Sequence, residues 1–234
     1  MFLTKEQLEE LREFDTPTVW NALEGFKLRS NTVGFTYPGL RLQTPNAKPM
    51  IGYAVTARIS GMEAPNAEQK NMLFDFFENI YNADFPTIAV MEDVDERPIG
   101  SFWGEVQATT CKALGAVGTL TQGGVRDLNE VGPLGFYFFS TEIMVARAES
   151  HIIEQNCPVQ ICGMPVNPGD LIHADCHGAV TIPKEAAPAL AEACRRVANA
   201  ELFVLDPCRE ALKTGIKPTV AQLREWRGEM AKHR

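Results

Sequence analysis

The feature that most constrains the fold is a series of apolar runs that end in acidic or glycine residues and alternate with helical stretches. Residues 50–60, MIGYAVTARIS, alternate and are rich in β-branched side chains, whereas residues 67–82 carry apolar residues at helical spacing. A second apolar run, residues 86–95, ends in acidic residues. A helix is then expected after Glu105, followed by a buried strand at residues 117–121. This strand-helix-strand order predicts a mixed α/β fold.

Helices are expected at both ends of the chain. Thr4 and Gln7 form a capping-box pattern that opens a short amphipathic helix, and Pro17 fits the first turn of a second helix that ends near Gly25. From Pro183 onward, an apolar stripe with charged residues opposite it predicts helices that pack on the sheet. Further short strands are expected at residues 136–139, 158–162, 171–174 and 179–182.

The composition is that of an ordinary folded protein. The 234 residues are 45% hydrophobic and 22% charged, and no low-complexity linker divides them, which predicts a single domain over residues 1–234. The net charge of −8 and the lack of a basic run argue against a nucleic-acid-binding face. The N-terminus lacks the apolar core of a signal peptide, and no apolar run is long enough to cross a membrane. We therefore expect a cytoplasmic protein that binds neither nucleic acid nor membrane.

The segment GTLTQGGVRD, residues 118–127, ends an apolar strand in two glycines and then presents Arg126 beside Asp127. Glycines let the backbone approach a ligand closely, and loops at strand ends are where open α/β sheets bind ligands. Arg126 is a permanently charged fork suited to a carboxylate or an oxyanion, and Asp127 is a hard oxygen ligand for Mg²⁺ or Mn²⁺. Taken alone, such a string is more often a turn with a surface salt bridge.

Gly104 and Glu105 precede the expected helix, whose N-terminal amides can receive an anion. We expect this loop to converge with the glycine loop that carries Arg126 and Asp127. Glu105 then suits a proton acceptor or a residue that holds a metal-bound water, although an acidic residue at a helix start also serves as a favourable cap.

These residues resemble a known family. Gly104-Glu105, followed after twenty residues by Arg126-Asp127, is similar to the acidic-x20-Arg-Asp signature of RraA-like proteins and of 4-hydroxy-4-methyl-2-oxoglutarate aldolases. The similarity runs over residues 15–220 and includes TPTVWNAL near the start, GYAVTAR at 52–58 and NPGDLIHADCHGAVTIP at 167–183.

The resemblance implies a compact layered α/β domain of the swivelling β/β/α kind, with helical N- and C-terminal segments, assembled as a trimer or hexamer. It also implies a lyase that cleaves a 4-hydroxy-2-oxo acid to release pyruvate, or decarboxylates oxaloacetate, through a pyruvate enolate. The cofactor would be Mg²⁺ or Mn²⁺. The alternative in the same family is a non-catalytic regulator that binds an endoribonuclease or another protein.

The resemblance also assigns roles to individual residues. Asp127 would ligate the metal, largely through water, and Arg126 would bind the carboxylate or keto oxygen of the substrate. Glu105 would occupy the acidic position that manages protons together with water. The pyruvoyl carboxylate would be bound by the backbone amides of the segment Gly104, Glu105, Val106 and Gln107.

Three positions depart from the family pattern and leave the substrate open. Glu105 stands where aldolases more often have Asp, Gln122 replaces Asp before Gly123, and Asn21 stands where Asp is frequent. Glu201 falls near a family glutamate that reaches a neighbouring subunit's site, but a solvated charge on a helix face is the preferred interpretation.

A second cluster of possible ligands lies further along the chain. His173, Asp175 and His177 would share one face of an extended strand, which makes a second metal site conceivable. Gly178 favours a hairpin there, so structural or surface roles are preferred. Trp103 is expected either in the core or in the wall of the pocket beside Gly104.

Overall fold

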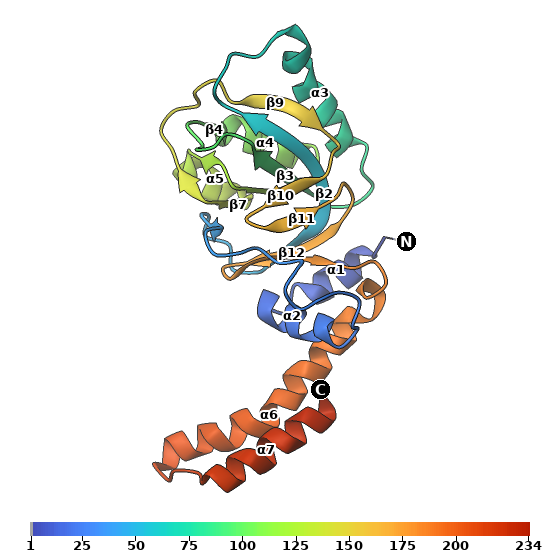
Figure 1. The fold of residues 1–234 in the computed structure, drawn as a ribbon, viewed down its shortest axis with the longest axis vertical. Coiled ribbons are helices and arrows are strands. Elements are labelled where there is room, and N and C mark those ends of the chain that lie inside the picture. The colour runs from blue at the N-terminus through green and yellow to red at the C-terminus, as the bar shows by residue number, and fades with distance from the viewer. Residues whose placement is uncertain (1) are drawn as a thin grey trace.

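The computed structural model describes residues 2–234 and is built around one large mixed sheet that curls into a nearly closed barrel (Figure 1). Neighbouring strands follow the order β1-β7-β5-β3-β2-β12-β13, and β9 also pairs with β2. The strands are β1 (Arg41–Leu42), β2 (Met50–Ser60), β3 (Thr87–Asp93), β5 (Ala116–Thr121), β7 (Tyr137–Ser140), β9 (His151–Gln155), β12 (Leu171–Asp175) and β13 (Gly178–Ile182).

The long strand β2 shapes this sheet. It pairs in parallel with β3, which continues in parallel to β5 and β7. On its other side, the first half of β2 pairs antiparallel with β12 and the second half pairs antiparallel with β9. Along this edge β2 therefore pairs with two strands, β12 and β9, and the sheet curves at β2.

Helices and two small sheets surround the barrel. The helix α3 (Ala67–Tyr81) packs against β9, and α4 (Glu105–Ala113) packs against β5. The short helix α5 (Leu128–Val131) follows β6. One small sheet pairs β10 (Val159–Ile161) with β11 (Met164–Val166), and the other joins β4 (Ser101–Trp103), β6 (Gly124–Val125) and β8 (Glu142–Ile143). Among residues 2–234, no helix has the length and apolar character needed to cross a membrane.

The two N-terminal helices form as predicted. The helix α1 (Lys5–Leu11) begins with the reciprocal hydrogen bonds of a Thr4–Gln7 capping box, and α2 (Thr16–Glu24) carries Pro17 in its first turn. Both helices share an apolar cluster with one end of the sheet and the first part of α6 (Leu190–Thr214).

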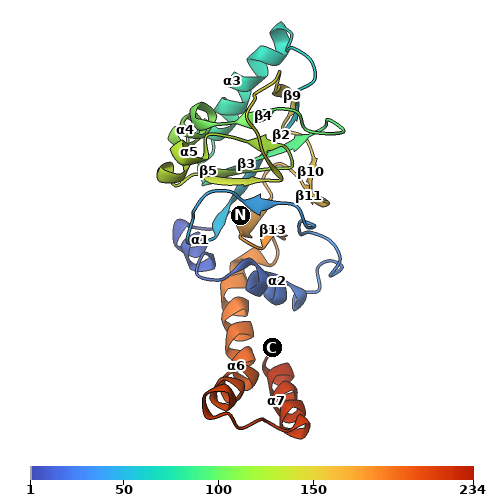
Figure 2. The ribbon, with the colours of Figure 1, turned by 90° about the vertical axis from the view of Figure 1, so that its left-hand side faces the viewer.

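The prediction that the C-terminal helices pack on the sheet is wrong for most of their length. The first part of α6 is buried up to Ala200, but Leu202 is 40% exposed and α7 (Val220–His233) has no buried residue. Figures 1 and 2 show the second half of α6 and α7 extending away from the sheet as a helical hairpin. The helical pattern is therefore correct, but within residues 2–234 no sheet covers its apolar face beyond Ala200.

His173 is fully buried where β12 meets the N-terminal helices. Its Nδ1 lies 3.0 Å from the hydroxyl of Thr16, and its Nε2 lies 3.2 Å from the carbonyl oxygen of Leu11. Because a carbonyl only accepts, Nε2 carries the proton and Nδ1 accepts from the hydroxyl. Burial lowers the pKa of His173 to about 4, and the hydrogen bond to Leu11 and the carboxylate of Asp175 only partly offset this effect.

Buried neutral His173 predicts stability that declines in acid. Its folded-state pKa of about 4 lies below the ordinary value of 6.5, so the unfolded chain takes up a proton first as the pH falls. The stabilisation is complete above pH 6.5 and is lost between pH 6.5 and pH 4. Replacement His173→Gln keeps a donor and an acceptor but does not titrate.

We expect the free energy of unfolding of the wild type, relative to His173→Gln, to fall by up to about 3 kcal/mol over this pH interval. Urea denaturation at a series of pH values measures the difference. A difference that stays constant with pH would contradict this account of His173.

Candidate active site

The predicted site forms where β4 and β6 run side by side. These strands pair in parallel with Trp103 opposite Val125, so Gly104 and Arg126, which follow them, are neighbours. The N–H of Arg126 donates to the carbonyl oxygen of Trp103 at 3.0 Å. Trp103 itself is fully buried and does not line the neighbouring cavity, so it belongs to the core.

Asp127 joins the two loops. Its Oδ2 accepts a hydrogen bond from the N–H of Glu105 at 2.9 Å and lies 3.8 Å from Nε of Arg126. The backbone of Asp127 has a φ of 58°, in the left-handed region that side-chain-bearing residues adopt uncommonly. A Cβ placed at Gly104 would lie only 2.5 Å from the same Oδ2, so glycine at this position leaves the room that the contact needs.

The start of α4 offers backbone donors. The N-cap residue Gly104 has no side chain, and among the described residues the only side-chain acceptor for this helix start is Asp127, which takes the N–H of Glu105. The N–H groups of Val106 and Gln107 have no acceptor within residues 2–234. Free amides at the positive end of a helix dipole suit a carboxylate.

A cavity of about 350 Å³ opens beside these groups. Glu105 is exposed and is not part of the cavity wall, although its sequence neighbours Gly104 and Val106 are. The predicted site residues that line the cavity are Gly104, Val106, Gln107, Arg126 and Asp127.

Two further cations line the same cavity. Lys70 comes from α3, and Arg147 comes from the loop before β9. Within residues 2–234 neither forms an ion pair with a carboxylate, and the guanidinium of Arg147 donates to the carbonyl oxygen of Ser150 at 3.3 Å. Asp127 is the one carboxylate among the wall residues, which include three Lys and Arg side chains. The cavity is therefore locally positive in a protein whose net charge is −8.

His151, the first residue of β9, also lines the cavity. Its Nδ1 lies 2.8 Å from the carbonyl oxygen of Glu149, so Nδ1 carries the proton. Its Nε2 is buried and has no hydrogen-bond partner within residues 2–234. An unpaired buried acceptor costs free energy until a water or a ligand satisfies it. Sequence reasoning missed Lys70, Arg147 and His151, since no local motif marks them.

The groups around Asp127 fit a largely hydrated Mg²⁺ or Mn²⁺. One carboxylate oxygen is engaged by Glu105 and Arg126, whereas Oδ1 forms no hydrogen bond within the described chain. Mg²⁺ commonly keeps several waters and takes one or two carboxylates together with substrate oxygens. Asp127 would hold such an ion, and a bound keto acid would supply further oxygens.

The positions that depart from the family pattern lie outside the cavity wall. Gln122 forms hydrogen bonds to the backbone at the ends of β3 and β10. Its Nε2 donates to the carbonyl oxygen of Asp93 at 3.2 Å, and its Oε1 accepts from the N–H of Cys162 at 3.1 Å. Burial raises the pKa of Asp93 to about 6. Asn21 lies on α2 and Glu201 on α6, neither of which contributes to the wall.

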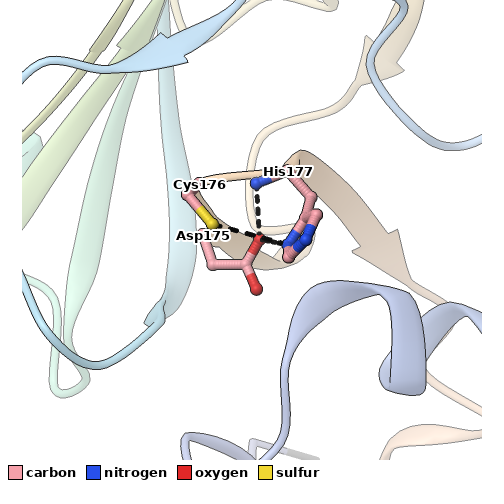
Figure 3. Close-up of side chains that lie close together, drawn as sticks. All are labelled: Asp175, Cys176 and His177. Atoms are coloured by element: carbon pink, nitrogen blue, oxygen red, sulfur yellow. Dashed lines mark hydrogen bonds and ion pairs between the residues drawn. The ribbon is translucent and has the colours of Figure 1, made fainter.

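The second cluster of possible ligands is a hairpin turn (Figure 3). Ligand atoms of Asp175, Cys176 and His177 lie within 4.8 Å of one another. However, Oδ2 of Asp175 accepts from the N–H of Thr16, and Oδ1 accepts from the N–H of His177 and lies 3.0 Å from its Nδ1. Buried His173 does not join the group. The preferred interpretation, a turn linking β12 to β13, accounts for these contacts.

A family model matches most of this chain: the RraA-like model, described as Aldolase/RraA, covers residues 16–181. The chain belongs to the RraA-like family. That family includes both aldolase or decarboxylase enzymes and inhibitors of ribonuclease E.

Curated relatives of this RraA-like protein match it in part. It is 33% identical over 100 residues to an uncharacterized protein of Methanocaldococcus jannaschii, covering 42% of this chain and 48% of that protein. It is 33% identical over 82 residues to a Halalkalibacterium halodurans protein provisionally named as a 4-hydroxy-4-methyl-2-oxoglutarate aldolase, covering 35% of this chain and 39% of that protein. The matched segments thus span less than half the length of these relatives.

Solved structures match this RraA-like protein over nearly its whole length. An uncharacterized protein of Pseudomonas syringae superposes with a TM-score of 0.70 at 23% identity, covering 96% of this chain and 95% of that one. A Streptomyces coelicolor protein, described as an unusual member of the RNase ES inhibitor RraA protein family, gives a TM-score of 0.68 at 21% identity, covering 87% and 97%. At these identities the likeness shows the fold, and it confirms the expected layered α/β architecture of RraA-like proteins.

Proposed function

We propose that this protein is a metal-dependent lyase that releases pyruvate from a 4-hydroxy-2-oxo acid or from oxaloacetate. The observation that carries the proposal is the convergence of Arg126, Asp127 and the open amides of α4 on one locally positive cavity. Bound Mg²⁺ or Mn²⁺ would supply Lewis-acid stabilisation of the keto oxygen. The aldolase name of one curated relative agrees with this reaction class.

The chain's own groups suit the chemistry of carbon–carbon cleavage. Amides of Val106 and Gln107 bind the carboxylate of the keto acid, and the guanidinium of Arg126 contacts the keto oxygen. As the bond between C3 and C4 breaks, its electron pair moves toward C3 and the keto oxygen, so negative charge grows beside Arg126. A fixed cation next to developing charge is the largest kind of catalytic contribution available to such a site.

Proton transfers accompany and follow the cleavage of the C3–C4 bond. In the retro-aldol reaction, a base takes the proton of the 4-hydroxyl group, and C3 is later protonated to give pyruvate. Decarboxylation of oxaloacetate needs only the second transfer. Glu105 stands at the first residue of α4, outside the cavity wall, and therefore handles these protons through water.

The charge balance of the wall indicates a substrate with two carboxylates. Arg126, Lys70 and Arg147 carry three positive charges against the single negative charge of Asp127. One carboxylate is expected at the start of α4, and a second is expected between Lys70 and Arg147. Oxaloacetate and 4-hydroxy-4-methyl-2-oxoglutarate both have two such groups.

The competing function is that of a regulator that binds an endoribonuclease, since the family includes such inhibitors. The cation-lined cavity favours the enzyme, because binding a protein surface requires no such site.

We also propose that the protein is a homo-oligomer, as the resemblance to trimeric and hexameric relatives implies.

Activity assays test the proposed site directly. Pyruvate release from oxaloacetate and from 4-hydroxy-4-methyl-2-oxoglutarate is measured with Mg²⁺, with a chelator, and in the variants Arg126→Ala and Asp127→Ala. We expect the chelator and each substitution to lower kcat/KM at least a hundredfold, since the chelator removes the metal, Asp127→Ala removes the carboxylate that would hold it, and Arg126→Ala removes the cation beside the developing negative charge. Lys184→Met, an exposed cation outside the cavity, serves as the matched control.

Activity that persists with chelator and in both variants would place the chemistry elsewhere. Absence of pyruvate release from both substrates under all conditions would favour the regulator. Unchanged thermal unfolding of the variants shows that any loss comes from the site.

Lys70 and Arg147 are expected to set substrate specificity. Their replacement, Lys70→Met or Arg147→Met, removes a charge-assisted hydrogen bond to the second carboxylate and should raise KM for the dicarboxylate substrates by about tenfold or more. The KM for 4-hydroxy-2-oxopentanoate, which has one carboxylate, should stay unchanged. Equal effects on both kinds of substrate would refute the assignment of these residues to the second carboxylate.

A further inference from the structure

His151 is the only buried ionisable side chain among the described residues of the cavity wall. Its side chain belongs to a residue that is 7% exposed, and its Nε2 has no hydrogen-bond partner within residues 2–234. The chemistry proposed above gives this nitrogen no part. Because an unpaired buried acceptor destabilises a fold, its place at the cavity points to a group that enters the cavity as its partner.

The tautomer and the position of the ring are fixed by the backbone around it. Nδ1 donates to the carbonyl oxygen of Glu149 at 2.8 Å, so Nε2 carries the lone pair. The N–H of Glu149 donates to the carbonyl oxygen of Gly61, and the N–H of Ser101 donates to the carbonyl oxygen of Ala146. These bonds hold the segment before β9 against the end of β2 and the start of β4. Nε2 is therefore a fixed acceptor, which is the form that a general base requires.

His151 lies next to a residue that is expected to bind the second carboxylate of the substrate. Arg147 lines the same cavity, and its guanidinium donates to the carbonyl oxygen of Ser150, the residue before His151, at 3.3 Å. In 4-hydroxy-4-methyl-2-oxoglutarate, the second carboxylate is bonded directly to C4, the carbon that carries the hydroxyl group. A substrate held at α4 by one carboxylate and at Arg147 by the other therefore has its 4-hydroxyl group on the side of the cavity where His151 lies.

We propose that Nε2 of His151 is the base that takes the proton of the 4-hydroxyl group in retro-aldol cleavage. The O–H bond breaks, and its electron pair forms the double bond between C4 and oxygen. The electron pair of the C3–C4 bond moves toward C3 and the keto oxygen. The proton passes from Nε2 through water to Glu105, which returns it through water to C3. This inference rests on the proposed lyase function and adds the residue that touches the hydroxyl group.

The two candidate reactions differ in their need for this base. Oxaloacetate has no 4-hydroxyl group, and its C3–C4 bond breaks with loss of carbon dioxide, so no proton is removed before cleavage. Both reactions form the same enolate beside Arg126. His151 should therefore be required for retro-aldol cleavage and dispensable for decarboxylation.

Assays with both substrates test this assignment. His151→Asn keeps an N–H donor for the carbonyl oxygen of Glu149 and removes Nε2, whereas His151→Gln places an amide that is not basic near the position of Nε2. We expect both variants to lower kcat for pyruvate release from 4-hydroxy-4-methyl-2-oxoglutarate by about a hundredfold or more, as loss of a general base does. The kcat for oxaloacetate decarboxylation should stay at the wild-type level.

His177→Asn, at an exposed histidine outside this cavity, is the matched control and should leave both reactions unchanged. Thermal unfolding verifies that each variant is folded. If the wild type is active, His151 variants that lose both reactions equally, or that keep both, would overturn the role of His151 and leave the lyase function standing. A wild type that decarboxylates oxaloacetate but cleaves no 4-hydroxy acid would overturn that role as well. A wild type that is inactive with both substrates would refute the lyase function itself, and the role of His151 with it.

Discussion

The hydrogen bond from the N–H of Glu105 to Oδ2 of Asp127 is the interaction on which the candidate site depends. It connects the start of α4 to the loop after β6 and thereby fixes the distance between the helix amides and Arg126. It forms only because Gly104 has no side chain and because the backbone of Asp127 adopts a left-handed conformation. The same contact leaves the other oxygen of Asp127 available, so one residue both builds the site and is suited to hold a cation.

The surroundings of this contact concentrate positive charge where the rest of the chain is acidic. Lys70 and Arg147 come from opposite sides of the segment that carries the predicted motif and meet Arg126 across the cavity. A site of this kind attracts a dianionic acid without making the whole protein basic. Elsewhere in the chain, burial shifts the pKa of ionisable side chains. It raises the pKa of Asp93 to about 6 and lowers the pKa of His173 to about 4.

Sequence reasoning succeeded where local pattern and burial coincide. The strand predicted at residues 50–60 matches β2 because β-branched residues there lie between two layers of the fold. The convergence of Gly104 with Arg126 was also expected, from a helix start placed opposite a glycine loop, and the parallel pair of β4 and β6 brings it about. The short strands β4, β6 and β8 were missed, because segments of two or three residues have no measurable periodicity.

The sequence analysis failed where the answer depends on contacts between segments that are far apart in the sequence. Lys70, Arg147 and His151 sit on ordinary surface elements, and only the folded chain brings them to one cavity. The apolar stripe of α6 has helical spacing along its whole length, but spacing does not identify which surface covers it. The stripe is buried up to Ala200, whereas Leu202 is 40% exposed.

The central claim is that the chain stabilises a pyruvate enolate beside Arg126, and proton exchange reports that species directly. Pyruvate in D₂O is followed by NMR with the wild type and Mg²⁺, and with Arg126→Ala. The account predicts enzyme-dependent exchange of the C3 protons for deuterium by the wild type and none above background by the variant. Absence of exchange by the wild type, or equal exchange by both proteins, would contradict it.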